Sequence, residues 1–283
     1  MSGKAIIAIM YDFDRTLSVE DMQNYRFIPS LGMSADEFWA AANGFARESR
    51  MDGILAYMYT MIEKAKEHNI KFRRETLVSM GKGIEFFPGV TEWFARINKY
   101  GRSQGVEIEH YVISSGLREI IQGSGICGEF KEIFASEFHY NTDGFPVWPK
   151  AAVNYTNKTQ FIYRINKGIL DISNDKDLNR SMPDNSKRVR FSNMIYIGDG
   201  LSDVPCMKMV KAYGGQSIAV YEHEDRKKVE ELLERDRVDY IYPADYRENS
   251  GLDITVKNII RKMSISDILS KETAFQHASL RQD

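Results

Sequence analysis

The sequence predicts an α/β protein with a doubly wound, largely parallel sheet that is interrupted once by a block of helices. Three observations lead to this prediction: short apolar runs alternate with helical stretches, the runs end at polar residues, and one long segment lacks any strand pattern. Nearly continuous apolar runs are typical of strands covered by helices on both faces. The runs of this kind are Ala5–Tyr11, Glu109–Ile113, Asn193–Ile197, Gln216–Tyr221 and Asp239–Tyr242.

Helical patterns and one hairpin fill the intervals between these runs. Helices are expected at Val90–Tyr100, Leu117–Gly123 and Arg226–Arg235, and Glu137–Trp148 predicts a hairpin. The polar segment Asp171–Ser192 is expected to be a long surface loop. Strands alternating with helices indicate a doubly wound sheet, in which ligands bind outside the carboxyl ends of the strands. The polar residues at those ends are therefore the first candidates for chemistry.

The segment from 18 to 85 contains no convincing strand and is rich in Met and aromatic residues. Ser34 is expected to be the N-cap of a helix, with Glu37 completing a capping box. Apolar residues between 54 and 65 then follow the i, i+3/i+4, i+7 spacing of an amphipathic helix. Pro88 punctuates the return to the strand-and-helix pattern. These signals predict a small helical domain inserted directly after the first strand.

Composition excludes several classes of protein. The 283 residues carry 38 Lys+Arg against 40 Asp+Glu, so we expect neither disorder nor a nucleic-acid binder that works by neutralising phosphates. Cys127 and Cys206 are far apart, and the five histidines show no zinc-ligand spacing. The first apolar run is too short to span a bilayer and makes a poor signal peptide, so we expect no membrane partner and a cytoplasmic protein. Nothing in the sequence indicates an oligomeric state.

Two acidic residues follow the first predicted strand. Asp12 and Asp14 alternate around Phe13, which places both carboxylates on the same side of an extended chain. Carboxylates this close repel each other, and a cation, a shared proton or full solvation must offset that cost. The pair is a candidate for metal binding or for acid–base work, although a short motif of this kind also occurs in ordinary polar loops.

A second acidic pair, Asp199 and Asp203, follows another predicted strand, where Gly198 and Gly200 allow a sharp turn. Because the carboxyl ends of parallel strands meet at one edge, we expect both pairs to converge there. All-oxygen acidic clusters suit hard cations, above all Mg²⁺. The sequence therefore predicts a magnesium site made from four carboxylates.

Groups that can hold an anion are expected beside this cluster. Ser114 and Ser115 close a predicted strand just before a helix, where hydroxyl and backbone N–H groups are available to an anion. Lys158 opens another helical stretch and is a candidate for neutralising phosphate and carboxylate together. Lys150 and Lys167 are rivals that spacing does not exclude.

Taken together, DFDRT at Asp12–Thr16, Ser114 at the end of a strand, Lys158 at the start of a helix and GDGLSD at Gly198–Asp203 resemble the haloacid dehalogenase superfamily. The order and relative positions of all four motifs match, and the match covers nearly the whole chain. The resemblance implies a Rossmann-like doubly wound core with an inserted α-helical cap domain of the C1 type. The chain is most similar to phosphoserine phosphatases and, less closely, to pyrimidine 5′-nucleotidases.

Residue 18 to residue 85 is where that superfamily carries its cap, so we expect residues 18–85 to form the cap and residues 1–17 and 86–283 the catalytic core. The resemblance implies that Asp12 is a nucleophile that forms an aspartyl-phosphate. It also implies that Asp14 protonates the leaving group and then activates water. The residues implied to hold the phosphoryl group are Thr16, Ser114, Ser115 and Lys158. The ligands implied for Mg²⁺ are Asp12, Asp14 through its backbone carbonyl, Asp199 and Asp203.

The expected activity is hydrolysis of a small phosphorylated metabolite, because haloacid dehalogenases lack the second acid that this chain has at Asp14. Three alternatives stay open: a nucleotidase, a phosphotransferase or mutase, and a non-catalytic regulatory module on the same fold. The cap offers several candidates for substrate recognition without a clear pattern. Glu20 and Asp21 are candidates for binding an amine, and Arg47 and Arg50 for binding a carboxylate. The candidates for stacking on a nucleotide base are Trp39, Phe45 and Tyr57.

Overall fold

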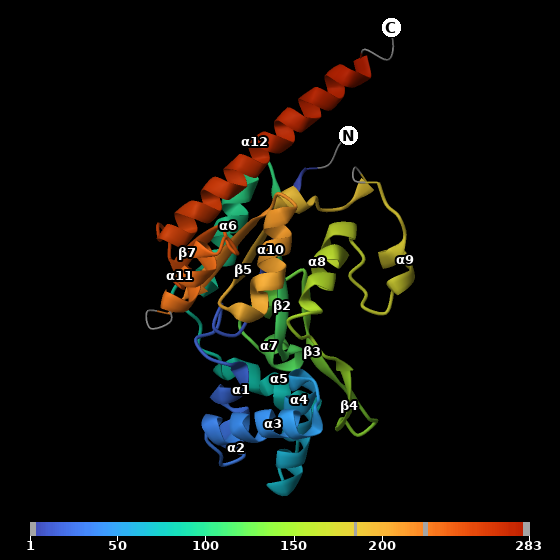
Figure 1. Ribbon diagram of the computed structural model, residues 1–283, viewed down its shortest axis with the longest axis vertical. Coiled ribbons are helices and arrows are strands. Elements are labelled where there is room, and N and C mark those ends of the chain that lie inside the picture. Colours follow the sequence, from blue (N-terminus) through green and yellow to red (C-terminus); the bar gives the residue numbers. More distant parts are fainter. Residues whose placement is uncertain (1–3, 184–185, 223–225, 280–283) are drawn as a thin grey trace.

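The computed structural model describes residues 4–183, 186–222 and 226–279, and it contains a central sheet with helices on both faces (Figure 1). The strand order is β4-β3-β2-β1-β5-β6-β7, and every neighbouring pair is parallel except β3 and β4. The strands are β1 (Ile6–Tyr11), β2 (Glu107–Leu117), β3 (Glu132–Tyr140), β4 (Pro146–Ala151), β5 (Met194–Gly198), β6 (Gln216–Tyr221) and β7 (Tyr240–Pro243). The predicted α/β fold is confirmed.

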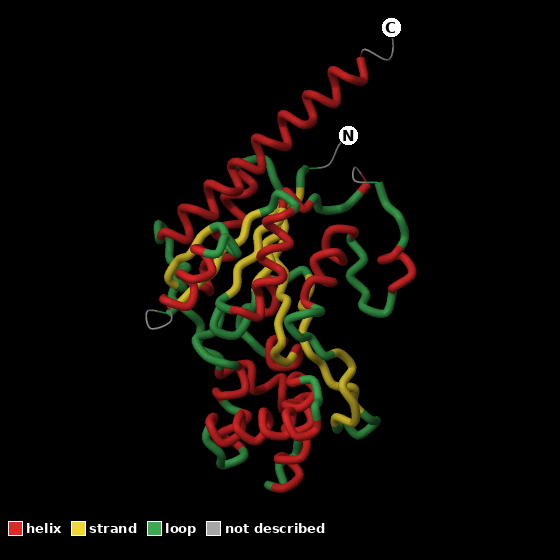
Figure 2. Tube along the Cα trace, viewed as in Figure 1, coloured by secondary structure: helices red, strands yellow, loops and turns green. Residues whose placement is uncertain are grey.

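Helices cover this sheet on both sides, as the continuous apolar strands require. The helices are α1 (Met22–Tyr25), α2 (Phe27–Ser30), α3 (Ala35–Ser49), α4 (Gly53–Glu67), α5 (Arg74–Met80), α6 (Val90–Ser103), α7 (Arg118–Gln122), α8 (Lys158–Lys167), α9 (Asp175–Asn179), α10 (Val204–Ala212), α11 (Arg226–Glu234) and α12 (Gly251–Ser279). Side chains of β1 alternate between two buried clusters, one containing residues of α6 and α12 and the other residues of α8, α10 and α11. Figure 2 shows the strands between these two helical layers.

The second strand differs from the prediction. We expected it to end at Ile113, but β2 runs on to Leu117, so Ser114 and Ser115 lie within the strand. Its last residues still pair with β3, through a register shift between Ser114 and Leu117. The helix that follows, α7, begins at Arg118. Pairing with β3 therefore extends the strand beyond the point where its apolar run stops.

The helices α1 to α5 lie together beyond one end of the sheet (Figure 1). As predicted, Ser34 caps α3, and Glu37 returns the reciprocal hydrogen bond of a capping box. The chain leaves and re-enters the core through two adjacent segments. The Val19 N–H donates to the carbonyl of Glu85, and the Phe87 N–H donates to the carbonyl of Leu17. The two crossings therefore lie side by side.

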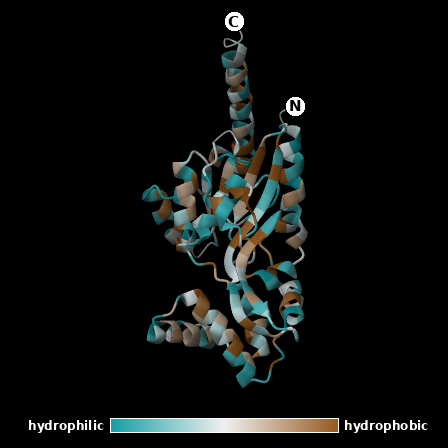
Figure 3. Ribbon diagram, turned by 90° about the vertical axis from the view of Figure 1, so that its right-hand side faces the viewer, coloured by the Kyte–Doolittle hydropathy of each residue, from teal (hydrophilic) through white to brown (hydrophobic). Residues whose placement is uncertain are grey.

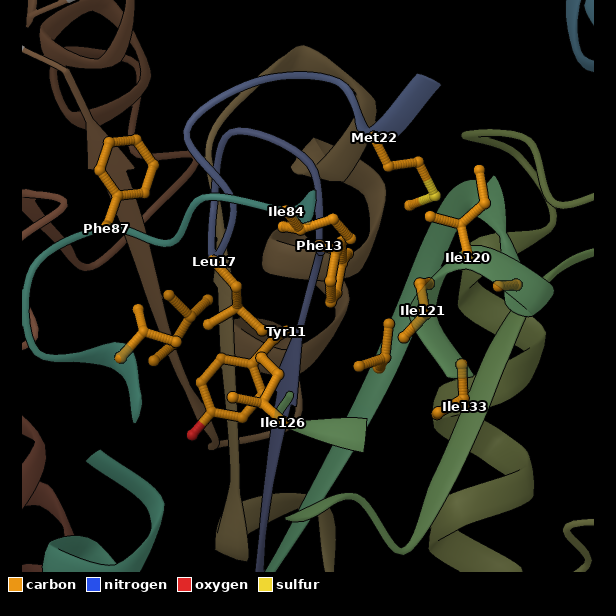
Figure 4. Close-up of a cluster of buried hydrophobic side chains, with 14 of the residues drawn as sticks. Tyr11, Phe13, Leu17, Met22, Ile84, Phe87, Ile120, Ile121, Ile126 and Ile133 are labelled. Carbon is orange, nitrogen blue, oxygen red and sulfur yellow. The ribbon is translucent and has the colours of Figure 1, made fainter. Parts of the chain in front are cut away.

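Apolar side chains fill the space beneath these crossings. Phe13, Leu17, Met22 and Ile84 are each at most 9% exposed. Figure 4 shows Phe13 and Ile84 close together, with Leu17 and Tyr11 beside them. Phe13 stands between the two acidic residues that follow β1, so its burial fixes the backbone on which both carboxylates are carried.

Two further segments complete the molecule. The predicted hairpin is present as β3 and β4, and the predicted long loop contains the short helix α9. The last helix, α12, extends well beyond the rest of the molecule (Figure 3), and its outer part exposes Ile265, Ile268, Leu269 and Phe275. Within the described ranges, no helix is both long enough and apolar enough to cross a membrane.

Candidate active site

Three carboxylates meet at the carboxyl ends of β1 and β5, which are neighbours in the sheet. Asp12 follows β1 directly, and its N–H continues the pairing by donating to the carbonyl of Ile197 (2.9 Å). Asp199 follows β5, and Asp203 ends the short 3₁₀ helix Leu201–Asp203. One carboxylate oxygen from each aspartate lies within 4.8 Å of the other two. The convergence of Asp12, Asp199 and Asp203 follows from the parallel order of the strands.

A buried lysine joins two of these carboxylates. The Lys158 Nζ lies 3.1 Å from Asp12 Oδ1 and 2.8 Å from Asp203 Oδ1, and its side chain is fully buried. Its rivals are engaged elsewhere: Lys150 pairs with Glu137, and Lys167 donates to backbone carbonyls of the 171–192 loop. Lys158 occupies this place because it is the first residue of α8, which begins beside the carboxyl ends of the strands.

Burial makes the cluster electrostatically costly. It raises the pKa of Asp12 to about 7, with repulsion from Asp203 adding to the effect and Lys158 opposing it. Burial also raises the pKa of Asp199 well above its usual value, followed by repulsion from Asp203 and Asp12. For Lys158, burial acts to lower the pKa, but Asp12 and Asp203 outweigh it and the pKa is raised. One lysine therefore does not compensate the three carboxylates.

The donor set fits a divalent cation of the oxygen-binding kind. Asp203 uses Oδ1 to accept hydrogen bonds from Lys158 and from the Tyr196 hydroxyl (2.7 Å). Its Oδ2 is buried and has no hydrogen-bond partner within the part of the chain that the structure describes. A buried carboxylate oxygen without a donor is costly, and a metal ion or a metal-bound water would satisfy it. The residues present thus fit Mg²⁺ or a similar hard cation.

Asp14 is held apart from this group of three. Its Oδ1 accepts a hydrogen bond from the N–H of Met22 (2.8 Å), at the start of α1. A Cβ placed on Gly116 would lie 2.8 Å from Asp14 Oδ2 and 2.1 Å from the Met22 methyl, so a larger residue there would have to displace the ends of these two side chains. Burial raises the pKa of Asp14 well above its usual value, followed by repulsion from Asp21 and Asp12. Asp14 is thus protonated more readily than an ordinary aspartate.

Two hydroxyl groups predicted to meet an anion are buried close to these acids. The Thr16 Oγ1 is fully buried and has no partner among the residues described, although its backbone carbonyl accepts from the Tyr246 hydroxyl. Ser114 is also buried, and its Oγ accepts from the N–H of Gly116 (3.0 Å), which leaves the hydroxyl hydrogen for another acceptor. Ser115 is placed differently, because its carbonyl accepts hydrogen bonds from Tyr57 and Ser136.

Helix α4 of the inserted block reaches the core at two points. The Tyr57 hydroxyl donates to the carbonyl of Ser115 (2.8 Å). Asp52 caps α4 with one carboxylate oxygen and accepts from the Asn154 side chain with the other (2.9 Å). Asn154 in turn accepts the backbone N–H of Lys158 through its carbonyl (3.0 Å). These hydrogen bonds therefore link the start of α4 to the segment from which α8 begins.

Most of the side chains considered for substrate recognition already have partners, either within the insertion or, for Asp21, in the loop that follows β1. Asp21 lies 3.5 Å from Arg15, Glu20 accepts from Asn24, and Trp39 donates to the same Asn24. Phe45 stacks on Tyr59, Arg47 donates to a carbonyl of its own helix, and Arg50 forms the C-cap of α3. Tyr57 is the member of this group that touches Ser115.

One contributor, Tyr196, was missed from the sequence, and Tyr57 was considered there only for stacking on a base. Tyr196, inside β5, donates to Asp203, and Tyr57 reaches the end of β2. Each lies in an apolar run where a tyrosine has the pattern of a core residue. For Tyr196 the available signal was the strand alternation that places its side chain on the same face as α8.

Comparison with known proteins agrees with this arrangement. The chain is 28% identical over 276 residues to an uncharacterized protein of Borreliella burgdorferi, covering 87% of this chain and 94% of that one. Its fold resembles a HAD family hydrolase from Salmonella enterica (TM-score 0.57, 16% identity, 89% of this chain and 70% of that one). It also resembles a phosphoserine phosphohydrolase-like protein from Francisella tularensis (TM-score 0.52, 18% identity, 88% and 98%).

The model of the haloacid dehalogenase-like hydrolase family matches residues 9–208, which include the second half of β1, the whole inserted block and the acid cluster. The resemblance noted from the four motifs is thereby confirmed. With more than half of its length matched, the chain belongs to the family of haloacid dehalogenase-like hydrolases.

Proposed function

We propose that the protein is a Mg²⁺-dependent phosphatase that hydrolyses a small phosphate monoester through an aspartyl-phosphate. The observation that carries this proposal is the buried contact of Lys158 with both Asp12 and Asp203 at the carboxyl ends of β1 and β5. A lysine in this place is shared between carboxylates and can also neutralise a phosphoryl oxygen. Similarity in fold to proteins described as phosphoserine phosphatases supports the same reaction class.

In the proposed first step, one carboxylate oxygen of Asp12 attacks phosphorus, and the ester oxygen leaves with the proton of Asp14. In the second step, Asp14 takes a proton from water, whose oxygen attacks the phosphorus of the aspartyl-phosphate and releases orthophosphate. Met22 N–H holds Asp14 Oδ1, so Oδ2 is the oxygen assigned to proton transfer. The elevated pKa of Asp14 supports its assignment as the acid.

Phosphate-binding roles are proposed for four residues. Thr16 has a buried hydroxyl with no partner in the described parts of the chain, and Ser114 has a free hydroxyl hydrogen, so each can donate to a phosphoryl oxygen. Lys158 supplies positive charge. Ser115 is proposed to act through its own hydroxyl, which can donate to a phosphoryl oxygen, while its carbonyl accepts the Tyr57 hydroxyl.

The proposed ligands of Mg²⁺ are the carboxylates of Asp12, Asp199 and Asp203 and the backbone carbonyl of Asp14. When bound, the ion screens the charge of the phosphate so that an anionic nucleophile can approach it. The unpartnered Oδ2 of Asp203 supports this assignment.

We further propose that residues 18–85 are the cap that selects the substrate. The paired crossings at Val19 and Phe87 support these boundaries. The contact of Tyr57 with Ser115 places α4 against the proposed phosphate site. A small metabolite, enclosed between this helix and the ends of the strands, is the proposed substrate.

The test is phosphate release from p-nitrophenyl phosphate and from a panel containing phosphoserine and nucleoside monophosphates, with Mg²⁺ and with EDTA. Activity is expected only with the metal. Asp12→Asn should abolish turnover, and the exposed hairpin variant Asp143→Asn should leave it unchanged. With radiolabelled substrate, acid quenching should trap label on the wild type and not on Asp12→Asn. If Asp12→Asn kept wild-type activity, Asp12 would not be the nucleophile. If no member of the panel were hydrolysed, the protein would not be a phosphatase of small phosphate monoesters.

A further inference from the structure

A cavity lies at the opposite end of α8 from the acid cluster. It has a volume of about 600 Å³, and it is lined by Tyr163, Asn166, Lys187, Arg190, Phe191, Ser192 and Tyr213. Asn166 lies about 12 Å further along α8 than Lys158, at 1.5 Å per residue. Helices α8 and α10 pack together (Figure 1). The lining residues place the cavity near the last residues of both helices, where the segment 191–193 leads into β5. It is therefore separate from the proposed catalytic site.

Aromatic rings form one wall of this cavity. Phe191 stacks on Tyr213, with ring centroids 4.8 Å apart and planes at 26°, and meets Tyr163 edge-on at 5.5 Å. Tyr163 and Tyr213 remain 39% and 55% exposed, which is high for rings that belong to a packed cluster. Rings ordered in this way and still open on one side are suited to stacking with a further planar ring.

The floor of the cavity contains an incomplete hydrogen-bonding group. Asn166 is fully buried, and its Nδ2 donates to the carbonyl of Val189 (2.7 Å), which fixes the orientation of the amide. Its Oδ1 is buried without a hydrogen-bond partner in the residues described. Because Asn166 lines the cavity, an N–H or O–H donor on a molecule inside it would complete the amide.

The charged side chains that line the cavity are basic. Arg190 supplies positive charge to the lining, Lys187 already has an interaction partner, and no aspartate or glutamate is among the described lining residues. An anionic group is therefore favoured here over a cationic one. The volume lies within the range of roughly 300–1,000 Å³ that is usual for small-molecule sites.

We propose that this cavity is a second ligand site that binds a nucleoside monophosphate. This class combines the three features that the cavity lining calls for: a planar ring for Tyr213 and Tyr163, N–H donors of the base for Asn166, and a phosphate for Arg190. The site goes beyond the proposed phosphatase reaction, because it uses none of the residues assigned to that reaction. Binding and turnover are thus separate properties that can be measured separately.

The test uses the 5′-phosphonate analogues of AMP and GMP, which have no phosphate ester bond to hydrolyse, in isothermal titration calorimetry with the full chain. Arg190→Gln and Tyr213→Ala, both at exposed positions, should each weaken binding at least tenfold. The matched controls are Arg102→Gln and Tyr155→Ala, exposed residues outside the cavity, which should change affinity less than twofold. Asp12→Asn should also leave the affinity unchanged, because it lies outside this cavity.

Three results would overturn the proposal. The first is absence of binding by either analogue at millimolar concentration. The second is binding that Asp12→Asn weakens and Arg190→Gln does not, which would place the ligand at the acid cluster. The third is equal affinity for ribose 5-phosphate, which would show that the cavity recognises the anion and not the ring.

Discussion

Replacing Asp199 by asparagine is expected to stabilise the metal-free protein at alkaline pH. In the folded protein Asp199 is buried beside Asp12 and Asp203, and these effects together raise its pKa well above the usual value. A carboxylate whose folded pKa is raised makes the native state less stable once it is ionised. Asparagine has nearly the same shape and no charge, so it removes this cost.

The size of the effect follows from the geometry of the cluster. Two carboxylates 4.8 Å apart, the outer limit among the three aspartates, repel each other by about 3 kcal/mol at an effective dielectric constant of about 20. Asp199 faces two such carboxylates and one lysine, so one repulsion is offset by attraction to Lys158. We therefore expect Asp199→Asn to raise the free energy of unfolding by roughly 2–3 kcal/mol at pH 8 in EDTA.

The pH dependence has a definite sign. Because the folded pKa is raised, the stability that comes from the protonated carboxyl is fully present below the unfolded pKa of about 4 and is lost as pH rises through the folded value. The variant lacks this loss. Its advantage over the wild type should therefore be small near pH 4 and should grow as the pH rises, and Asp12, with a pKa of about 7, contributes a similar loss to both proteins.

The assay is urea unfolding followed by circular dichroism, at several pH values, with EDTA or with Mg²⁺. Addition of Mg²⁺ should stabilise the wild type and have little effect on Asp199→Asn. The control Asp143→Asn removes an exposed charge from the β3–β4 turn and should change stability by less than about 0.5 kcal/mol. If Asp199→Asn in EDTA at pH 8 unfolds at the same or lower urea concentration than the wild type, repulsion among the three aspartates does not control the stability of the metal-free protein.

Three further changes test other contacts. Lys158→Met should lower the free energy of unfolding, measured in urea, by about 3–5 kcal/mol, since it leaves buried carboxylates without their cation. The control Lys150→Met removes a half-exposed ion pair and should lower it by less than about 1 kcal/mol. Equal losses in the two variants would contradict this prediction. Asp52→Ala removes a helix cap and the bond to Asn154, so thermal melting should show a loss of about 1–2 kcal/mol, and an unchanged melting temperature would argue against it. Gly116→Ala should lower kcat for phosphate release at least tenfold by displacing Asp14, the proposed general acid. Full activity of this variant would show that Gly116 is not needed to position Asp14.

The sequence predicted the parallel strands and the convergence of three of the four acids because both depend on local patterns, whereas Asp14, the fourth, is held apart by its bond to Met22. Apolar runs ending at Asp12 and Asp199 are readable residue by residue, and parallel order then brings their ends together. Lys158 could not be separated from its rivals by spacing, since the choice depends on where α8 begins relative to the sheet. That position is a tertiary property.

The end of β2 and the contacts of the two tyrosines could not be predicted from the sequence for a similar reason. Pairing with β3 continues through Ser114, although the apolar run has stopped, and the run itself was the only strand signal. Tyr196 and Tyr57 have the pattern of core residues, and nothing in the sequence marks where a hydroxyl finds its acceptor. Local propensity placed these residues in the correct elements and left their contacts unassigned.

The paired crossings at the base of the helical block have a consequence for how the chain can be rearranged. The two ends of the block are joined by hydrogen bonds from Val19 to Glu85 and from Phe87 to Leu17, as neighbouring strands would be. Adjacent strands are about 5 Å apart, so a short turn would close the core if the block were removed. The block is therefore an exchangeable insertion: a block of different length can replace it while the order of the strands is kept.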